Sequence, residues 1–174
     1  MEPYWRYAVD LYPFQKRRIP VARFLCKRKG CTFSLLPEQL IPYVQYTVEA
    51  VVRTMLLVLE HRRRGQRGFY GASLEVDPDS LVTPWLIACW LAVVLKGLRR
   101  AHPVLRARYD LSEIRTTGRE ESVGVELQVY FTALGAWPPP AGPKVLLAVA
   151  RSYSRQSGGF LFGTPSQLRR LRSR

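Results

Sequence analysis

The stretch that decides the fold is IPVARFLCKRKGCTFSLLPEQLIPYVQY, from Ile19 to Tyr46. It contains two of the chain's three cysteines, Cys26 and Cys31, and the turn between them consists of Lys27, Arg28, Lys29 and Gly30. Basic side chains beside a thiol favour the thiolate, and glycine permits the positive φ that such turns often use. The turn therefore predicts one half of a zinc ribbon.

Half a ribbon is not a complete metal site. A structural zinc takes four ligands in a tetrahedral arrangement, and Cys26 and Cys31 supply two of them. Cys89 lies in a long apolar run that predicts a buried helix, while His61 and His102 follow Cys31 by 30 residues or more, without the spacing of a histidine ligand pair. We expect zinc only if the missing ligands are supplied from elsewhere. Otherwise the sequence predicts two free thiols in an exposed basic turn.

The residues around this turn carry a resemblance to a known family. On them, the chain resembles a bacterial domain family of uncharacterised function found with mobile elements and, more loosely, the N-terminal zinc-ribbon and helical DNA-binding region of insertion-sequence transposases. The resemblance covers about residues 4 to 115. It is carried by Arg23, Phe24, Cys26, Cys31, Phe33, Leu35, Leu36, Pro37, Leu40, Pro42, Tyr43 and Tyr46.

The chain departs from that family's pattern at its start. In the relatives a C-x2-C knuckle precedes a segment similar to Tyr4-Trp5-Arg6-Tyr7. Here the given sequence begins at Met1, after the position where that first knuckle is expected. Either the domain has lost its metal, or the given sequence begins inside a longer one, and we expect the second.

Charge points to a polyanionic partner. The chain has 174 residues, and its 27 Lys and Arg against 13 Asp and Glu give a net charge of +14. So large an excess of one sign is typical of proteins that bind nucleic acid, although a solvated basic surface is the alternative. Three cysteines without an even disulfide framework and the lack of a visible signal peptide predict a cytoplasmic protein.

The pattern before the cysteines predicts a β-hairpin. Tyr4 to Leu11 and Arg17 to Leu25 are rich in residues that favour strands, and Tyr12-Pro13-Phe14-Gln15 separates them. Trp5 and Tyr7 interleave with basic residues, so this hairpin either lies along phosphates or packs its aromatic rings against the helices.

Helical patterns follow. Pro37-Glu38-Gln39 opens the first, which runs from Pro42 or Tyr43 to Arg64 and ends at Gly65. Asp77-Pro78-Asp79-Ser80 reads as the cap of the next helix, which is apolar from Leu81 to Leu95 and ends near Arg100. Its apolar run is shorter than the roughly 20 residues that a bilayer core requires, so we expect a buried helix and no membrane span.

The last third of the chain is less regular. A polar segment, 112–124, forms a candidate boundary, and Val125 to Leu134 fits a helix or a strand. Trp137 to Pro143 is proline-rich and reads as a stiff linker or a docking segment, while Lys144 to Tyr153 predicts a short helix before a basic tail. The expected divisions are a partial ribbon over 1–36, a helical domain over 37–115, and a linker, short helices and tail over 116–174.

The sequence favours a mainly α protein with a small N-terminal β-hairpin and a helical bundle, acting as a DNA-binding accessory or truncated protein of a mobile element. The alternatives are a module that docks another protein of that element and a small membrane-associated protein. No motif predicts an enzyme, since the carboxylates are scattered and no phosphate-binding glycine loop is present. We expect the basic clusters to share one face and to contact phosphates; the candidate residues are Lys16, Arg17, Arg18, Lys27, Arg28, Lys29, Arg62, Arg63, Arg64, Arg99, Arg100, Arg169, Arg170 and Arg172.

Overall fold

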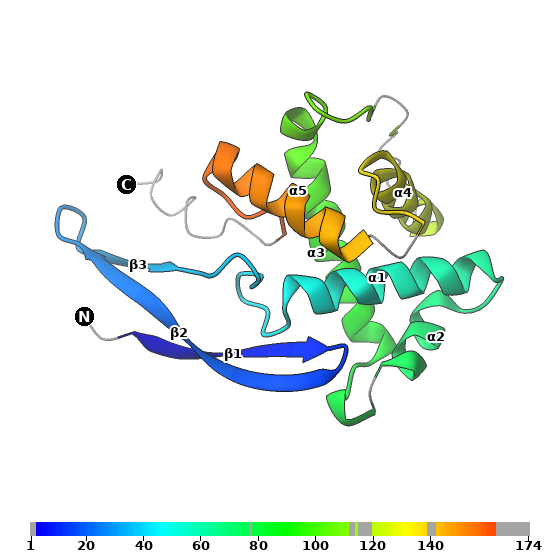
Figure 1. The fold of residues 1–174 in the computed structure, drawn as a ribbon, viewed down its shortest axis with the longest axis horizontal. Coiled ribbons are helices and arrows are strands. Elements are labelled where there is room, and N and C mark those ends of the chain that lie inside the picture. Colours follow the sequence, from blue (N-terminus) through cyan, green and yellow to red (C-terminus); the bar gives the residue numbers. More distant parts are fainter. Residues whose placement is uncertain (1–2, 77, 112–113, 115–119, 139–141, 163–174) are drawn as a thin grey trace.

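The computed structural model describes residues 3–76, 78–111, 114, 120–138 and 142–162. Within them, a three-stranded antiparallel sheet is followed by five α-helices and one 3-10 turn (Figure 1). The expected order of a small N-terminal β structure followed by helices is confirmed, and the structure adds a third strand.

The sheet is built around one long strand. β2 (Phe14–Cys26) pairs with β1 (Tyr4–Leu11) from Phe14 to Val21 and with β3 (Cys31–Leu35) from Ala22 to Cys26. In the order β1-β2-β3, the two shorter strands occupy opposite edges of β2 and different parts of its length. The result is a narrow ribbon, which is mostly two strands wide and whose β2–β3 end extends away from the helices (Figure 1).

Thr47 joins the ribbon to the helices. Its backbone N–H donates to the Val9 carbonyl at 3.0 Å, and its hydroxyl donates to Asp10 Oδ1 at 2.6 Å. The same hydroxyl accepts a hydrogen bond from Ala50 N at 3.1 Å, so Thr47 is the N-cap of α1 (Val48–Arg63). The expected start of this helix at Pro42 or Tyr43 is wrong, because Tyr43 has a φ of 67°, which lies outside the helical region.

The second long helix also differs from its expected bounds. Asp79 and Ser80 belong to the 3-10 turn η1 (Pro78–Ser80), and α3 (Pro84–Leu105) begins later, with the Thr83 hydroxyl accepting from Leu86 N at 3.2 Å. The helix then continues past Arg100 and through Pro103. A proline in the last turn removes only one helical hydrogen bond, and the buried side chains of Ala101 and Leu105 offset that loss.

Three further helices complete the body. A short helix, α2 (Gly68–Glu75), lies between α1 and α3 in the chain. The segment from Val125 to Leu134, which fitted a helix or a strand, belongs mostly to the helix α4 (Glu120–Ala133). The last helix, α5 (Gly142–Ser157), is longer than the expected Lys144–Tyr153.

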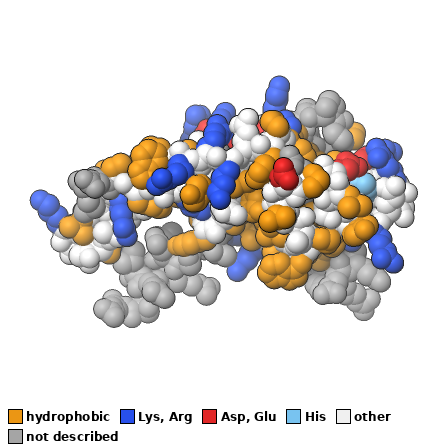
Figure 2. All heavy atoms as spheres, turned by 90° about the horizontal axis from the view of Figure 1, so that it is seen from below, with side chains coloured by type: hydrophobic (Ala, Val, Ile, Leu, Met, Phe, Trp, Pro, Cys, Tyr) orange, Lys and Arg blue, Asp and Glu red, His pale blue; other side chains and the backbone are white. Residues whose placement is uncertain are grey.

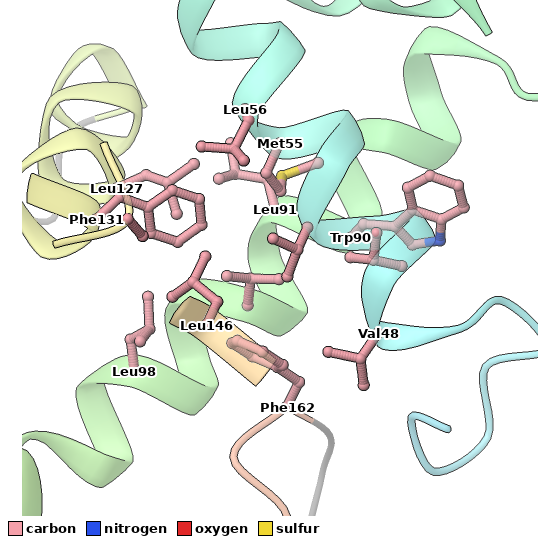
Figure 3. Packing of buried hydrophobic residues seen from close by; sticks show 14 of the residues in the cluster. Val48, Met55, Leu56, Trp90, Leu91, Leu98, Leu127, Phe131, Leu146 and Phe162 are labelled. Atoms are coloured by element: carbon pink, nitrogen blue, oxygen red, sulfur yellow. The ribbon is translucent and has the colours of Figure 1, made fainter. Parts of the chain in front are cut away.

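One hydrophobic cluster connects all these parts. Trp90 and Leu91 of α3 lie among side chains from α1, α4 and α5, and Phe162 reaches the same cluster from beyond α5 (Figure 3). Val9 and Leu11 of β1 belong to it too, and so do residues on both sides of the boundaries expected near 36 and 116. Among the described helices, none combines the length and the hydropathy that crossing a bilayer would need.

Candidate nucleic-acid interface

The turn between β2 and β3 places both cysteines opposite each other. Cys26 and Cys31 are register partners at the end of the ribbon, and the Cys26 carbonyl accepts hydrogen bonds from Lys29 N at 3.2 Å and Gly30 N at 2.9 Å. Gly30 has a φ of 61°, which explains why glycine occupies this position. The three basic side chains of Lys27, Arg28 and Lys29 are therefore displayed, exposed, at the ribbon's tip; we call these three residues the tip cluster.

The described residues do not complete a zinc site at this tip. No group of three or more His, Cys, Asp or Glu side chains comes together anywhere in the described part of the chain. Cys26 and Cys31 are both free and half-buried, and Cys89 is on α3. Two thiols meet half of the requirement for a tetrahedral zinc, so the chain's own described residues do not fit this metal.

Removing metal is expected to leave the fold intact. Because the core connects β1 with the helices without a metal ligand set, 1 mM EDTA should not change the melting temperature of the purified chain. The measurement is thermal unfolding by circular dichroism with and without EDTA, followed by re-addition of zinc. A fall of several degrees that zinc reverses would mean that ligands from another source complete the Cys26–Cys31 pair.

The ribbon is strongly basic along its whole length. Between Pro3 and Leu36 the chain has eight Lys and Arg residues and a single acid, Asp10. Two of the eight are engaged within the fold: Arg17 forms an ion pair with Asp10, and Arg6 donates to the carbonyls of Ile41 and Val44 at 3.0 and 2.7 Å. Within the described residues, no carboxylate lies at ion-pair distance from the other six, which are Lys16, Arg18, Arg23, Lys27, Arg28 and Lys29.

The expected single basic face is not what the structure shows. Arg62, Arg63 and Arg64 end α1 at the opposite end of the molecule from the tip cluster (Figure 1). Lys and Arg side chains are spread along the whole length of the face in Figure 2. Lys16, Arg17 and Arg18 lie on β2 close to its turn with β1, where they pair with Val9, Ala8 and Tyr7. About ten strand residues, roughly 33 Å, separate Lys16 from the tip cluster.

The cations at the far end have partners inside the protein. Glu60 receives hydrogen bonds from Arg63 Nη2 at 2.7 Å and from Arg64 Nε at 3.0 Å, and the bond from Arg63 is the largest cause that lowers the pKa of this carboxyl. Arg62 lies over the Phe69 ring at 5.8 Å. This pattern fits a role of these arginines as a charged end to the helix, where cations suit the helix dipole.

Arg99 and Arg100 are likewise engaged. Arg99 donates to both carboxylate oxygens of Glu126, whose side chain is 2% exposed, and these bonds raise the pKa of Arg99. Burial also raises the pKa of Tyr130, whose hydroxyl bonds to His102 Nδ1 at 3.1 Å. Arg100 donates to the Phe160 carbonyl at 2.6 Å and to that of Leu161 at 3.3 Å. Arg169, Arg170 and Arg172 lie outside the described residues.

The aromatic residues of the ribbon are mostly exposed. Trp5 and Tyr7 were expected to lie along phosphates or to pack on the helices, and they do not enter the hydrophobic core. Each has a basic side chain over its ring: Lys16 Nζ is 4.4 Å from the Tyr7 centroid, and Arg18 Cζ is 5.5 Å from that of Trp5. Arg23, which was not among the expected phosphate contacts, lies over Tyr4 in the same way, at 5.9 Å. The alternation of side chains along β2 could have predicted this contact, because Arg23 is two residues beyond Val21, the register partner of Tyr4.

Comparisons with family models, with curated proteins and with solved structures found no match for this chain. The resemblance to a mobile-element family therefore stays a prediction.

Proposed function

We propose that this chain binds DNA through its β ribbon, with Lys16, Arg18, Arg23 and the tip cluster contacting phosphates. The observation that carries the proposal is a set of six cations on one ribbon that have no carboxylate partner among the described residues. A paired cation is already neutralised and gains little from a phosphate, whereas an unpaired one releases counterions from DNA. A two-stranded β ribbon is also narrow enough to enter the major groove of B-DNA.

The helical body has a supporting role in this proposal. It fixes the base of the ribbon through Thr47 and through Val9 and Leu11 in the core, and it leaves the β2–β3 end projecting. Arg63 and Arg64 at the end of α1 pair with an acid, and Arg99 and Arg100 on α3 are engaged with an acid and with carbonyls, so these four contribute little to affinity. No catalytic step is part of the proposal, and the association with a mobile element is kept as an expectation from the sequence.

Binding to random duplex DNA is expected to depend steeply on salt. If six phosphates are neutralised, the logarithmic slope of affinity against salt is about −5.4, so affinity falls on the order of a thousandfold between 50 and 200 mM NaCl. Fluorescence anisotropy of a labelled 20-base-pair duplex across that range measures the slope. An affinity that is independent of salt would contradict the electrostatic account.

A second candidate function is protein docking. Large apolar side chains between residues 70 and 85 are exposed, namely Tyr70, Leu74, Leu81 and Trp85, and a groove of about 710 Å³ lies between α1, α3 and α4. In this alternative the basic ribbon only assists. The same titration separates the two functions, because a pure adaptor retains no duplex at micromolar protein.

A further inference from the structure

We propose that one face of the ribbon is a stacking surface for the unpaired bases of single-stranded DNA. This inference rests on the proposed function and specifies its substrate, since it adds contacts to bases where the basic residues contact only phosphates. The face is defined by the strand register and consists of Trp5, Tyr7, Lys16, Arg18, Phe24 and Phe33; we call it the aromatic face.

The register places these six side chains on one side of the sheet. Successive side chains of a strand point to opposite faces, and residues directly paired across strands share a face. Tyr7 pairs with Arg18, and Phe24 pairs with Phe33. Trp5 is two residues from Tyr7 on β1, while Lys16 and Phe24 differ from Arg18 by an even number of residues on β2. The partner of β2 changes from β1 to β3 between Val21 and Ala22, but β2 is one continuous strand from Phe14 to Cys26, so the alternation is counted along β2 itself.

The aromatic face is exposed at Trp5, Tyr7, Phe24 and Phe33, whereas Val9 and Leu11, which share its side by alternation, are buried in the core. On the other side of the ribbon, burial is likewise confined to the part near the helices, because Tyr4 and Arg23 are exposed. Arg6 and Ala8 point to the other side, where Arg6 bonds to the carbonyls of Ile41 and Val44, and Ala8 and Val21 are buried. On the aromatic face the exposed fractions are 56% for Trp5, 46% for Tyr7, 43% for Phe24 and 47% for Phe33. A hollow of about 560 Å³ adjoins it, lined by Trp5, Tyr7, Pro42 and Tyr43 among others.

This composition fits unpaired bases. In a duplex, both faces of each base are covered by its neighbours, so rings on a protein surface can stack only on bases that are unpaired. Lys16 lies over the Tyr7 ring and Arg18 lies over the Trp5 ring. Each ring therefore has a cation beside it that can contact the phosphate of a stacked nucleotide. Phe24 and Phe33 are 5.4 Å apart with an interplanar angle of 21° and extend the surface toward the tip cluster.

The same composition favours DNA without sequence preference. Reading base edges takes Asn, Gln, Asp or Glu side chains as well as arginine, and recognising the ribose 2′-hydroxyl takes polar neutral groups. Apart from the Tyr7 hydroxyl, the aromatic face offers no neutral hydrogen-bonding side chain. We therefore commit to single-stranded DNA bound by stacking and charge.

The test compares oligo(dT) of 20 nucleotides with a duplex of the same length, using the full chain and fluorescence anisotropy. Trp5→Ala and Tyr7→Ala are each expected to weaken oligo(dT) binding about tenfold while changing duplex binding less than twofold. Trp5→Phe with Tyr7→Phe keeps the rings and should keep most of the affinity, which separates stacking from misfolding. Tyr70→Ala is the matched control, because Tyr70 is similarly exposed but lies on α2.

Other outcomes overturn the inference in distinguishable ways. The stacking surface would be contradicted if an alanine variant lost equal affinity for oligo(dT) and duplex, or if neither variant lost affinity. The proposed function would still stand if replacing Lys27, Arg28 and Lys29 together weakened DNA binding. No effect from any of these variants would remove both. Tighter binding of oligo(rU) than of oligo(dT) would overturn the assignment to DNA.

A spectroscopic readout is independent of affinity. Trp5 and Trp85 are exposed, whereas Trp90 and Trp137 are buried, so Trp85→Phe leaves Trp5 as the exposed indole. Stacking of a base on Trp5 should quench its fluorescence in that variant at saturating oligo(dT). Unchanged emission would contradict a base on this ring.

Discussion

Replacing Lys27, Arg28 and Lys29 together with glutamine is expected to weaken duplex DNA binding by about 100- to 500-fold at 0.1 M salt. The salt slope assigns about eightfold to each phosphate contact at this concentration, and the three side chains of the tip cluster have no carboxylate partner in the described residues. The slope itself should fall by about 2.7. Anisotropy titrations at several salt concentrations measure both quantities.

The matched control removes the same charge from the far end of the molecule. In the variant Arg62→Gln, Arg63→Gln, Arg64→Gln the net charge also falls by three, but two of these side chains already pair with Glu60. Its affinity should fall less than about tenfold, the loss expected from a weaker overall field. Equal losses in the two triple variants would mean that net charge, and not the ribbon, governs binding.

Gly97→Ala is expected to destabilise the fold by about 3–5 kcal/mol, through loss of the buried Leu161 and Phe162. A Cβ atom at Gly97 would lie 2.1 Å from the Leu161 carbonyl oxygen and 3.1 Å from its carbonyl carbon. These are backbone atoms that Arg100 holds in place, so they cannot move away as a side-chain end can. The segment from Phe160 to Phe162 would have to leave α3, which exposes apolar surface. Thermal unfolding should show a melting temperature lower by about 10 °C.

Gly124→Ala provides the contrasting case. This helical glycine in α4 meets only the end of the Arg62 side chain, which is flexible and can rotate aside. Alanine favours a helix by about 1 kcal/mol over glycine, so the variant should be as stable as the parent or slightly more so. If Gly97→Ala were equally well tolerated, the close approach of α3 to Leu161 would be wrong.

The sequence predicted elements better than it predicted their ends. Val48, Val51, Met55 and Leu59 recur at three- and four-residue intervals, which is the periodicity of an amphipathic helix, and α1 has these side chains in the core. Its start was missed because Thr47 reads as an ordinary residue until Asp10, from a distant strand, fixes its hydroxyl. The end of α3 was missed for a related reason: proline signals a stop locally, but Leu105 is buried by packing that no local pattern contains.

The candidate site was predicted in part. Charge counting found the basic ribbon, but it could not tell which cations are already neutralised, because the partners are remote in sequence. Glu126 follows Arg99 by 27 residues, and the carbonyl that binds Arg100 follows it by 60. Arg23, Phe24 and Phe33 entered the sequence analysis only through a family resemblance, and the pairing of Phe24 with Phe33 required the register of β2 with β3.

The most direct test is a map of the backbone amides that respond when random duplex DNA is added to isotopically labelled full-length chain. If the ribbon is the binding surface, the largest chemical-shift changes will fall between residues 4 and 35, concentrated at the tip cluster, and the amides of Arg62 to Arg64 will change little. A map with its maximum at the end of α1, and a quiet ribbon, would contradict the account.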